Sequence, residues 1–386
     1  MTLEFVADLP PKEEAKRETT MDGTVQVAVI GVGALGRHHA RILANMDGVK
    51  LVAVADPNEQ QGRAVAEACG CEWTHDFRTL LKSVDAASIV VPTFLHRQVG
   101  EAFLSNSIPI LIEKPLAGRV EDGETLVRLA QEHEVPLQVG HIERFNPAFR
   151  DLADWTGEPK YLRAERLSPY AFRSMDIGVI HDLMIHDIEL CLTLTQEMPH
   201  RVEAFGVSLV GGREDAVQAR LYFPNGCIAD LTANRVCPAP SRKLQCWSDA
   251  GFVSADLTSR ILQKFSPSDL MKSGQLPFEL AESNRQSIDS LKPQVFGAFI
   301  ETSEEQADDT DALTAELTEF IRCVLTGHEP SVSGRSALAA LKVAAAIQGQ
   351  VATHQWDGLP DGRIGADALL SHYLAPTPIE ADQAAA

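Results

Sequence analysis

Between Val25 and Gly140, short apolar runs alternate with stretches of helical spacing. The apolar runs are VQVAVI (25–30), KLVAVA (50–55), AASIVV (86–91), PILI (109–112) and PLQVG (136–140). Amphipathic stretches such as 36–46 and 120–134 separate them. Continuous apolar strands joined by helices indicate a parallel sheet that is buried on both faces. The pattern therefore predicts an α/β Rossmann domain over residues 25–147.

A second pattern begins after about Pro147, where alternating apolar and polar positions indicate antiparallel strands. The expected strands are 159–167, 200–210, 216–223, 226–234 and 243–249. The dipeptide Asn225-Gly226, between two of them, predicts a hairpin turn. A helix is expected near 182–194, and helical spacing returns over 311–350.

These segments predict an α+β C-terminal domain over 148–373, built on a large, mostly antiparallel, open-faced sheet. The polar span 264–308 matches neither period. Residues 1–24 and 374–386 are polar or low in complexity, and we expect a disordered extension and a flexible tail there. A chain of 386 residues is too long for one ordinary core, which supports the division into two domains.

Composition narrows the class of protein. The net charge of −20 argues against nucleic acid and anionic membranes as partners. No apolar run approaches the roughly 20 residues of a membrane helix, and the N-terminus lacks the features of a secretory signal, so a cytoplasmic protein is expected. The seven cysteines include no CxxC pair. We therefore predict no metal site and interpret the cysteines as reduced, small apolar residues.

A glycine-rich hexapeptide follows the first predicted strand and opens the first predicted helix. Its residues are Gly31, Val32, Gly33, Ala34, Leu35 and Gly36. Glycines at this spacing make a tight turn, let the backbone approach a pyrophosphate and let the helix pack closely on the strand. Asp56 follows twenty positions later, where a carboxylate binds ribose hydroxyls and repels a 2′-phosphate. NAD is therefore the expected cofactor; a structural turn and a helix N-cap at Asp56 are the alternatives.

A lysine follows the predicted strand at 109–112, in the sequence Glu113-Lys114-Pro115. Ligands bind at the carboxyl ends of parallel strands, so Lys114 is expected beside the nicotinamide. There it could stabilise a developing alkoxide or relay a proton.

Six short segments together resemble the glucose–fructose oxidoreductase / inositol dehydrogenase / rhizopine catabolism (Gfo/Idh/MocA) family. They are IGVGALGRHHARIL (30–43), VADPN (54–58), VPTFLH (91–96), IEKPLA (112–117), GHIERFNPAF (140–149) and DLMIHDIEL (182–190). They keep the family's order over about residues 25–250. The resemblance implies an NAD-dependent oxidoreductase in which Lys114 is catalytic, His186 transfers a proton and Asp182 orients the imidazole.

The helix that carries Asp182 and His186 supports this role independently, because residues four apart share one helix face. An imidazole with a near-neutral pKa suits proton removal from a secondary alcohol. His181 and His186 lie five apart on different faces, which argues against a metal site.

The resemblance also places Pro92, Thr93 and His96 beside the cofactor and implies a cis Lys114–Pro115 bond. Each of three residues could have either of two roles. His96 could be an exposed residue at a helix start, Glu113 could bind the ribose or orient Lys114, and Arg144 could bind ligand or form a structural salt bridge.

Within the family, the segments around 140–149, 166–179 and 182–190 resemble the UDP-N-acetylglucosamine 3-dehydrogenase branch. That branch oxidises the sugar 3-hydroxyl with NAD, before a transaminase makes the 3-amino sugar of some lipid A molecules. The candidate substrate-binding residues are Lys114, His141, Arg166, Arg173, Asp182, His186 and Arg235. Guanidinium groups bind phosphate in a bidentate manner, so the arginines suit a diphosphate ligand, although each could also be an exposed strand charge.

Two other functions stay open. A free polyol such as an inositol would need neutral and acidic partners rather than several cations. A regulator that senses NAD or a sugar would usually lack the catalytic lysine or histidine, which this chain keeps at Lys114 and His186. Members of the family commonly pair through the open face of the C-terminal sheet, so a homodimer or homotetramer is expected.

Overall fold

The computed structural model describes residues 24–172, 177–210, 212–283, 286–357, 362–368 and 370. These residues form two compact units. The first unit comprises 24–151 and 307–342, and the second comprises 152–306 and the residues from Val343 onward. Of the extension and tail expected at 1–24 and 374–386, only Thr24 lies within the described residues.

In the first unit, the described residues form a six-stranded sheet whose neighbouring strands are all parallel, in the order β3-β2-β1-β4-β5-β6. The strands are β1 (Val25–Ile30), β2 (Val49–Ala55), β3 (Glu72–Thr74), β4 (Ala86–Ile89), β5 (Ile110–Glu113) and β6 (Leu137–Gly140). The predicted Rossmann domain is confirmed. The sequence missed only β3, which is too short to show a period. The strand order reverses between β1 and β4, the kind of position where open α/β sheets bind ligands.

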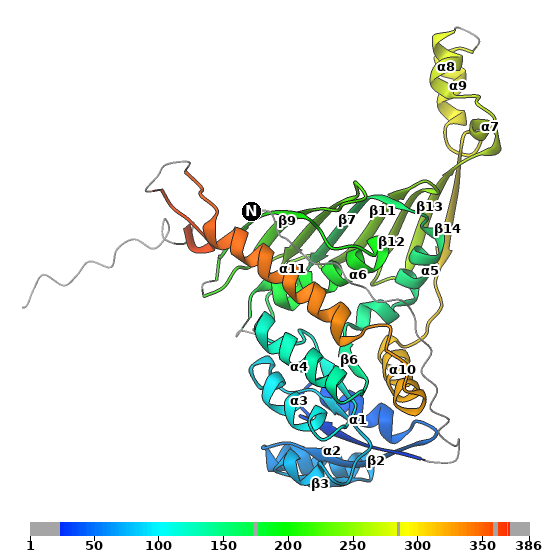
Figure 1. Ribbon diagram of the computed structural model, residues 1–386. Coiled ribbons are helices and arrows are strands. Elements are labelled where there is room, and N and C mark those ends of the chain that lie inside the picture. The colour runs from blue at the N-terminus through cyan, green and yellow to red at the C-terminus, as the bar shows by residue number, and fades with distance from the viewer. Residues whose placement is uncertain are drawn as a thin grey trace, which may run out of the picture. The chain divides into compact units, whose positions relative to one another are not determined.

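Helices cover both faces of this sheet (Figure 1). They are α1 (Gly36–Ala44), α2 (Glu59–Cys69), α3 (His96–Leu104) and α4 (Val120–Glu132), with short 3-10 turns at Phe77–Leu80, Thr93–Leu95 and Ile142–Phe145. Helix α5 (Pro147–Trp155) follows the last of these turns. One apolar cluster joins Leu43 of α1 to Val27 of β1. The other joins Phe103 of α3 and Leu126 of α4 to Ile110 of β5. Because both faces are buried, the strands read as continuous apolar runs.

Helix α10 (Ala312–Thr326) belongs to the first unit, although the sequence placed it in the C-terminal domain. Its buried stripe includes Leu313, Leu317 and Phe320, which join the same apolar cluster as Val27. The helical spacing expected over 311–350 is confirmed, but the structure divides it into two helices, α10 and α11 (Gly334–Thr353). The helical period shows that one face of a helix is buried, but it does not show which domain core that face packs against. The expected division at 147/148 therefore assigns residues 307–342 to the wrong unit.

In the second unit, the described residues form an eight-stranded sheet in the order β14-β13-β12-β11-β7-β10-β9-β8. The strands are β7 (Pro159–Leu167), β8 (Arg201–Val207), β9 (Ala216–Tyr222), β10 (Ile228–Asn234), β11 (Ser241–Ser248), β12 (Gly251–Asp256), β13 (Ile261–Pro267) and β14 (Ile300–Gln306). Only the β7–β10 pair is parallel among them. The expected mostly antiparallel sheet is confirmed, and so is the hairpin turn, where Gly226 has φ +84° between β9 and β10.

Helix α6 (Ile185–Thr195) lies against one face of this sheet and contacts β7 and β10 (Figure 1). It continues a single π-helical turn, Ile180–Met184. Alternate residues of the strands are buried, such as Leu162 and Leu244, whereas those between them are partly or fully exposed. One face of the sheet is therefore open, as the sequence predicted.

The polar span near 264–308 forms β13, β14 and a projecting arm between them (Figure 1). The arm contains α7 (Asp269–Lys272), α8 (Pro277–Glu282), α9 (Ile288–Leu291) and a 3-10 turn, Lys292–Gln294. Helices of one or two turns are too short to produce a clear period, so the arm could not be assigned from the sequence.

All seven cysteines are free thiols, and four of them are buried. Burial is the main cause that raises the pKa of Cys227 and of Cys246 to about 11. Such thiols stay protonated at neutral pH, in agreement with the interpretation as small apolar residues. Of the helices in the described residues, none is both long and apolar enough to cross a membrane.

Candidate active site

The strand ends of the parallel sheet bring together residues that are far apart in the sequence. Gly31 follows β1, Asp56 follows β2, Pro92 lies just beyond β4, Lys114 follows β5 and His141 follows β6. Because all these strands are parallel, their carboxyl ends lie along one edge of the sheet. That edge is where open α/β sheets bind their ligands.

The three positions of the hexapeptide that are occupied by glycine differ in what the structure requires of them. Gly31 has φ +85°, and a Cβ there would lie 2.5 Å from the carbonyl oxygen of Val90. A Cβ at Gly36 would collide with the carbonyl oxygen of Gly31. At Gly33, by contrast, no described atom lies within 4 Å of the Cβ position. The fold therefore requires Gly31 and Gly36, and the space at Gly33 remains available for a ligand.

Asp56 is 7% exposed, and its carboxylate holds the glycine-rich loop. One oxygen accepts hydrogen bonds from the Val32 N–H (2.9 Å) and the Gln61 side chain (3.3 Å), and the other accepts from the Asn58 N–H (2.8 Å). The N-cap of α2 is Asn58, whose side chain accepts from Gln61, so the alternative that Asp56 caps this helix is wrong.

These residues fit a dinucleotide. Helix α1 begins at Gly36, and within the described chain no side chain caps its N-terminus. Free N–H groups and the positive end of the helix dipole suit phosphate oxygens. Ala34 and Leu35 lie exposed at the mouth of the loop, while Val32 is buried beneath it. Residues 31–36 could hold the pyrophosphate, and Asp56, which lies beside this loop, could contact the adjoining ribose.

Lys114 is half-buried, and the Lys114–Pro115 peptide is cis, as the family resemblance implied. His141 is 1% exposed. Burial first, and then the charges of Lys114 and Arg144, lower its pKa to about 3. His141 is therefore a neutral imidazole at physiological pH, which can exchange hydrogen bonds with a sugar but adds no positive charge.

His96 is buried, with only 1% of its surface exposed. Its Nδ1 lies 2.9 Å from the carbonyl oxygen of Pro115, and its Nε2 lies 3.0 Å from that of Val91. The alternative that His96 is an exposed residue at the start of a helix is wrong. Thr93 is in a 3-10 turn beside it, and Pro92 precedes that turn.

The sequence left Glu113 with two interpretations, and the structure supports the orienting one. Its Oε2 accepts a hydrogen bond from the Lys114 N–H (3.2 Å), and its Oε1 lies 3.3 Å from His39 Nε2. The His39 Nδ1 is 2.9 Å from the Ser88 hydroxyl. The sequence analysis missed His39. The available signal was a histidine on the apolar stripe of α1, between Gly36 and Leu43.

Glu316 was missed in the same way, because it interrupts the apolar stripe of α10. It is 0% exposed, and in the described part of the chain neither carboxylate oxygen has a hydrogen-bond partner. Burial first, and then the charges of Glu113 and Glu319, raise its pKa well above the ordinary value. Glu316 is therefore a neutral acid inside the first unit.

In the second unit, the π-helical turn carries Asp182 and the first turn of α6 carries His186. Both residues are largely buried, at 7% and 8% exposure. The four-residue spacing returns to about the same side in either helix type, at roughly 100° per residue in an α-helix and somewhat less in a π-helix. The π turn is itself a feature often found at functional sites.

The predicted arginine cluster is the main correction. Arg166 is 3% exposed and makes a bidentate ion pair with Asp187 (2.7 and 3.0 Å). Arg235 is 6% exposed, contacts Asp215 at 2.8 Å and donates to the Ile177 carbonyl. Two of the three arginines are thus neutralised by buried carboxylates, and Arg173 lies outside the described residues.

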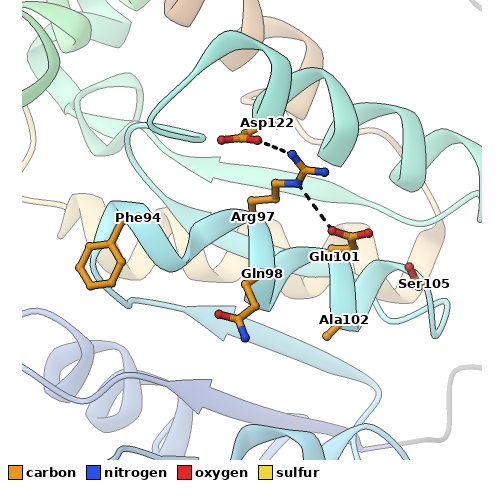
Figure 2. Close-up of a pocket in the computed structure, with 7 residues that line it drawn as sticks. All are labelled: Phe94, Arg97, Gln98, Glu101, Ala102, Ser105 and Asp122. Carbon is orange, nitrogen blue, oxygen red and sulfur yellow. Dashed lines mark hydrogen bonds and ion pairs between the residues drawn. The ribbon is translucent and has the colours of Figure 1, made fainter.

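A surface hollow of about 510 Å³ lies beside α3 of the first unit and does not include the residues at the carboxyl ends of the parallel strands (Figure 2). Its lining residues come from α3, its flanks and α4: Phe94, Arg97, Gln98, Glu101, Ala102, Ser105 and Asp122. Arg97 crosses it to pair with Asp122 (2.6 Å) and Glu101 (3.7 Å). None of the predicted site residues lines this hollow, and its cation is already paired, so we do not assign the chemistry to it.

The sequence matches two family descriptions. Residues 25–141 match "Oxidoreductase family, NAD-binding Rossmann fold", and residues 152–253 match "GFO/IDH/MocA C-terminal domain". Together they cover both halves of the predicted architecture.

Individual relatives extend this match. The chain is 35% identical over 330 residues to UDP-N-acetylglucosamine 3-dehydrogenase from Acidithiobacillus ferrooxidans, covering 84% of this chain and 97% of that protein. A solved structure of that enzyme aligns with a TM-score of 0.74 and 32% identity, over 84% of this chain and 97% of that one. The scyllo-inositol 2-dehydrogenase (NAD(+)) of Bacillus subtilis is 30% identical over 237 residues, 56% of this chain and 69% of that protein.

Proposed function

Because the chain belongs to the Gfo/Idh/MocA family of NAD-dependent oxidoreductases, we propose that it oxidises the 3-hydroxyl of UDP-N-acetylglucosamine to a 3-keto group. The observation that carries this proposal is the 35% identity with an enzyme of that name over 97% of its length. The strand-end residues support it, since they suit a dinucleotide and include Lys114 at the end of β5. A 3-keto nucleotide sugar is the substrate a transaminase needs to make a 3-amino sugar, as in some lipid A molecules.

In the proposed reaction, Lys114 and His186 act on the same hydroxyl. His186 takes the hydroxyl proton, and Asp182 orients its imidazole. The Lys114 ammonium stabilises the developing alkoxide, because a preorganised charge costs no reorganisation during the reaction. His141, which is neutral, exchanges hydrogen bonds with the sugar. When bound, NAD supplies the acceptor for the hydride that leaves the carbinol carbon.

A free polyol is the second candidate, and two observations favour it. One is the 30% identity with a scyllo-inositol dehydrogenase. The other is that Arg166 and Arg235, which were expected to bind a diphosphate, already pair with Asp187 and Asp215. We rank it second because the match to the nucleotide-sugar enzyme is longer and more identical.

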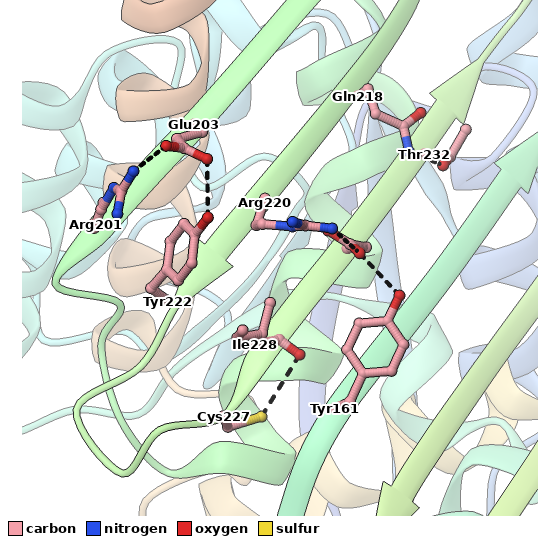
Figure 3. Close-up of polar contacts among 10 residues, drawn as sticks. Tyr161, Arg201, Glu203, Gln218, Arg220, Tyr222, Cys227, Ile228 and Thr232 are labelled. Atoms are coloured by element: carbon pink, nitrogen blue, oxygen red, sulfur yellow. Dashed lines mark hydrogen bonds and ion pairs between the residues drawn. The ribbon is translucent and has the colours of Figure 1, made fainter.

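We also propose that the protein forms a homodimer or homotetramer through the open face of the eight-stranded sheet. Charges on this face are paired locally: Arg201 with Glu203, and Arg220 with Asp230, which also accepts from the Tyr161 hydroxyl (Figure 3). A locally balanced face can meet its own copy although the chain carries a net charge of −20. Cytoplasmic location would suit the seven free thiols.

The experiment that tests the activity is a substrate comparison with the purified protein and NAD. UDP-N-acetylglucosamine should produce NADH, measured as absorbance at 340 nm, at least 100-fold faster than myo- or scyllo-inositol at equal concentration. This rate ratio corresponds to a difference of about 3 kcal/mol in transition-state free energy. Faster turnover of an inositol would replace the first candidate with the second. Lys114→Ala and His186→Ala should each lower turnover by about 100-fold or more while NAD affinity changes little. Unchanged turnover in both variants would remove the proposed roles.

A further inference from the structure

Two buried histidines connect the ends of strands β4 and β5, and neither belongs to the proposed proton-transfer pair. His39 comes from α1, which packs on one face of the sheet, and His96 begins α3, which packs on the other. They are 0% and 1% exposed. Each ring therefore approaches the same pair of strands from an opposite side.

The His39 ring links β4 to the residue before the proposed catalytic lysine. Its Nδ1 is 2.9 Å from the hydroxyl of Ser88 in β4, and its Nε2 is 3.3 Å from the carboxylate of Glu113 in β5. The same carboxylate accepts the N–H of Lys114 (3.2 Å). The Nδ1 contact with the Ser88 hydroxyl is a hydrogen bond. The Nε2 atom lies within ion-pair distance of the Glu113 carboxylate, but in the described residues it has no hydrogen-bond partner.

Gly140 completes this arrangement from the neighbouring strand β6. A Cβ at this position would lie 2.9 Å from the carboxylate oxygens of Glu113. Glycine here leaves room for the Glu113 side chain to turn back toward the Lys114 N–H instead of being pushed away. The carboxylate thus lies against the His39 ring on one side and against bare backbone on the other.

The His96 ring makes the corresponding link on the far side of the lysine. Its Nδ1 lies 2.9 Å from the carbonyl oxygen of Pro115 and its Nε2 lies 3.0 Å from that of Val91, the residue that leads out of β4. Burial, the largest cause, lowers the pKa of His96 below its ordinary value. The ring is therefore neutral at pH 7 and has a single N–H. With the hydrogen assigned to Nδ1, the ring donates to the Pro115 carbonyl, and Nε2 only packs against the Val91 carbonyl.

We propose that His39 and His96 are positioning residues that fix the Lys114–Pro115 backbone, His39 through Glu113 at the Lys114 N–H and His96 directly at the Pro115 carbonyl. The inference rests on the proposed catalytic role of Lys114. A flexible lysine side chain places its ammonium accurately only if its own backbone is fixed, and a misplacement of about 1 Å can cost about 100-fold in rate.

Apolar side chains could fill the positions of His39 and His96 without the cost of burying polar groups. Packing alone therefore does not explain why histidine occupies them. Each imidazole carries two nitrogen atoms on opposite sides of a rigid ring, so one side chain can join two strand ends.

Kinetics of four variants test the proposal. His39→Leu and His96→Leu keep an apolar volume and lose both contacts, whereas His39→Gln and His96→Asn keep an amide donor at about the position of the bonding nitrogen. The leucine variants should lower kcat about 10- to 100-fold, with KM for the sugar and Kd for NADH within about 3-fold. The amide variants should recover most of kcat. His133→Leu is the matched control, because His133 also pairs with a serine hydroxyl (Ser107, 3.1 Å) but does so at the surface.

Amide hydrogen exchange of the protein without cofactor or sugar gives a readout that does not depend on turnover. In His39→Leu the Lys114 amide should exchange about 10-fold faster than in the wild type, while α4 amides keep their rates. Unchanged Lys114 exchange, or a uniform loss of protection with equal loss of NADH affinity, would overturn the positioning role. Wild-type inactivity toward every sugar would instead defeat the proposed function and leave the exchange result standing.

Discussion

Arg166 and Asp187 form a bidentate ion pair in which each side chain is 4% exposed. Arg166 lies in β7, and Asp187 lies in α6 directly after His186. The pair therefore anchors the helix that carries His186 to the sheet of the second unit. We expect a cation fixed in this way to serve the placement of the imidazole rather than to bind an incoming diphosphate.

Removal of Arg166 should destabilise the protein more than it changes substrate affinity. Arg166→Ala leaves Asp187 as a buried, uncompensated charge, which costs about 3–5 kcal/mol. At about 2–4 °C per kcal/mol, the melting temperature should fall by several degrees or more. The double variant Arg166→Met/Asp187→Leu should recover most of the loss in a thermal melt. A single variant with wild-type melting temperature and a raised KM would show that Arg166 binds substrate after all.

The glycines of the loop should separate folding from cofactor binding. Gly33→Ala adds a methyl group where no described atom lies within 4 Å, so the melting temperature should change by about 1–2 °C at most. NAD binding, measured by calorimetry, should weaken at least about 10-fold, because the methyl group occupies the approach of the pyrophosphate. Gly36→Ala should destabilise the apoprotein itself, since its Cβ collides with Gly31. NAD affinity unchanged in Gly33→Ala would contradict the phosphate assignment.

Glu316 should make stability depend on pH. Its folded-state pKa is raised, chiefly by burial, so above the ordinary value of 4.5 the unfolded chain releases a proton that the folded protein keeps. Stability is then lost as pH rises toward the folded-state pKa. Glu316→Gln removes this loss, and its melting temperature relative to wild type should increase steadily from pH 5 to pH 8.

The exposed Glu132→Gln, which only breaks a surface pair with Arg128, should show no such trend. A constant difference between Glu316→Gln and wild type across this pH range would mean that the buried carboxyl does not stay protonated.

The open sheet face should control assembly. Trp247 is 36% exposed there and packs between Tyr161 and Phe252, with ring centroids 5.0 and 4.4 Å apart. Trp247→Arg should convert the oligomer to a monomer at micromolar concentration in light scattering, because a desolvated unpaired charge is costly. Gln131→Arg, at an exposed position of α4 in the first unit, adds the same charge outside this sheet and should leave the mass unchanged. An oligomer that survives Trp247→Arg would place the interface elsewhere.

The sequence predicted the helices and strands whose apolar positions form a clear local pattern. The runs at 25–30 and 86–91 became β1 and β4, because strands buried on both faces must be apolar throughout. The glycine motif located the loop for a different reason, since Gly31 combines a positive φ with a close approach to the Val90 carbonyl that leaves no room for a Cβ.

Other features depend on tertiary contacts that no local pattern contains. His39 and Glu316 stand on apolar stripes, but only the fold shows that both approach Glu113. Arg166 was read as a surface or ligand cation, because the sequence does not show that Asp187 faces it. The arm after β13 has helices too short to detect.

The most direct test of the central claim uses UDP-N-acetylglucosamine that carries deuterium at C3, with NAD and the purified protein. The account predicts that the NADH formed gains one mass unit and that turnover slows by about 2- to 5-fold through a primary isotope effect when chemistry limits the rate. Lys114→Ala and His186→Ala should form this product at least about 100 times more slowly. NADH without deuterium, or no NADH at all from this sugar, would contradict the claim that the protein oxidises that carbon.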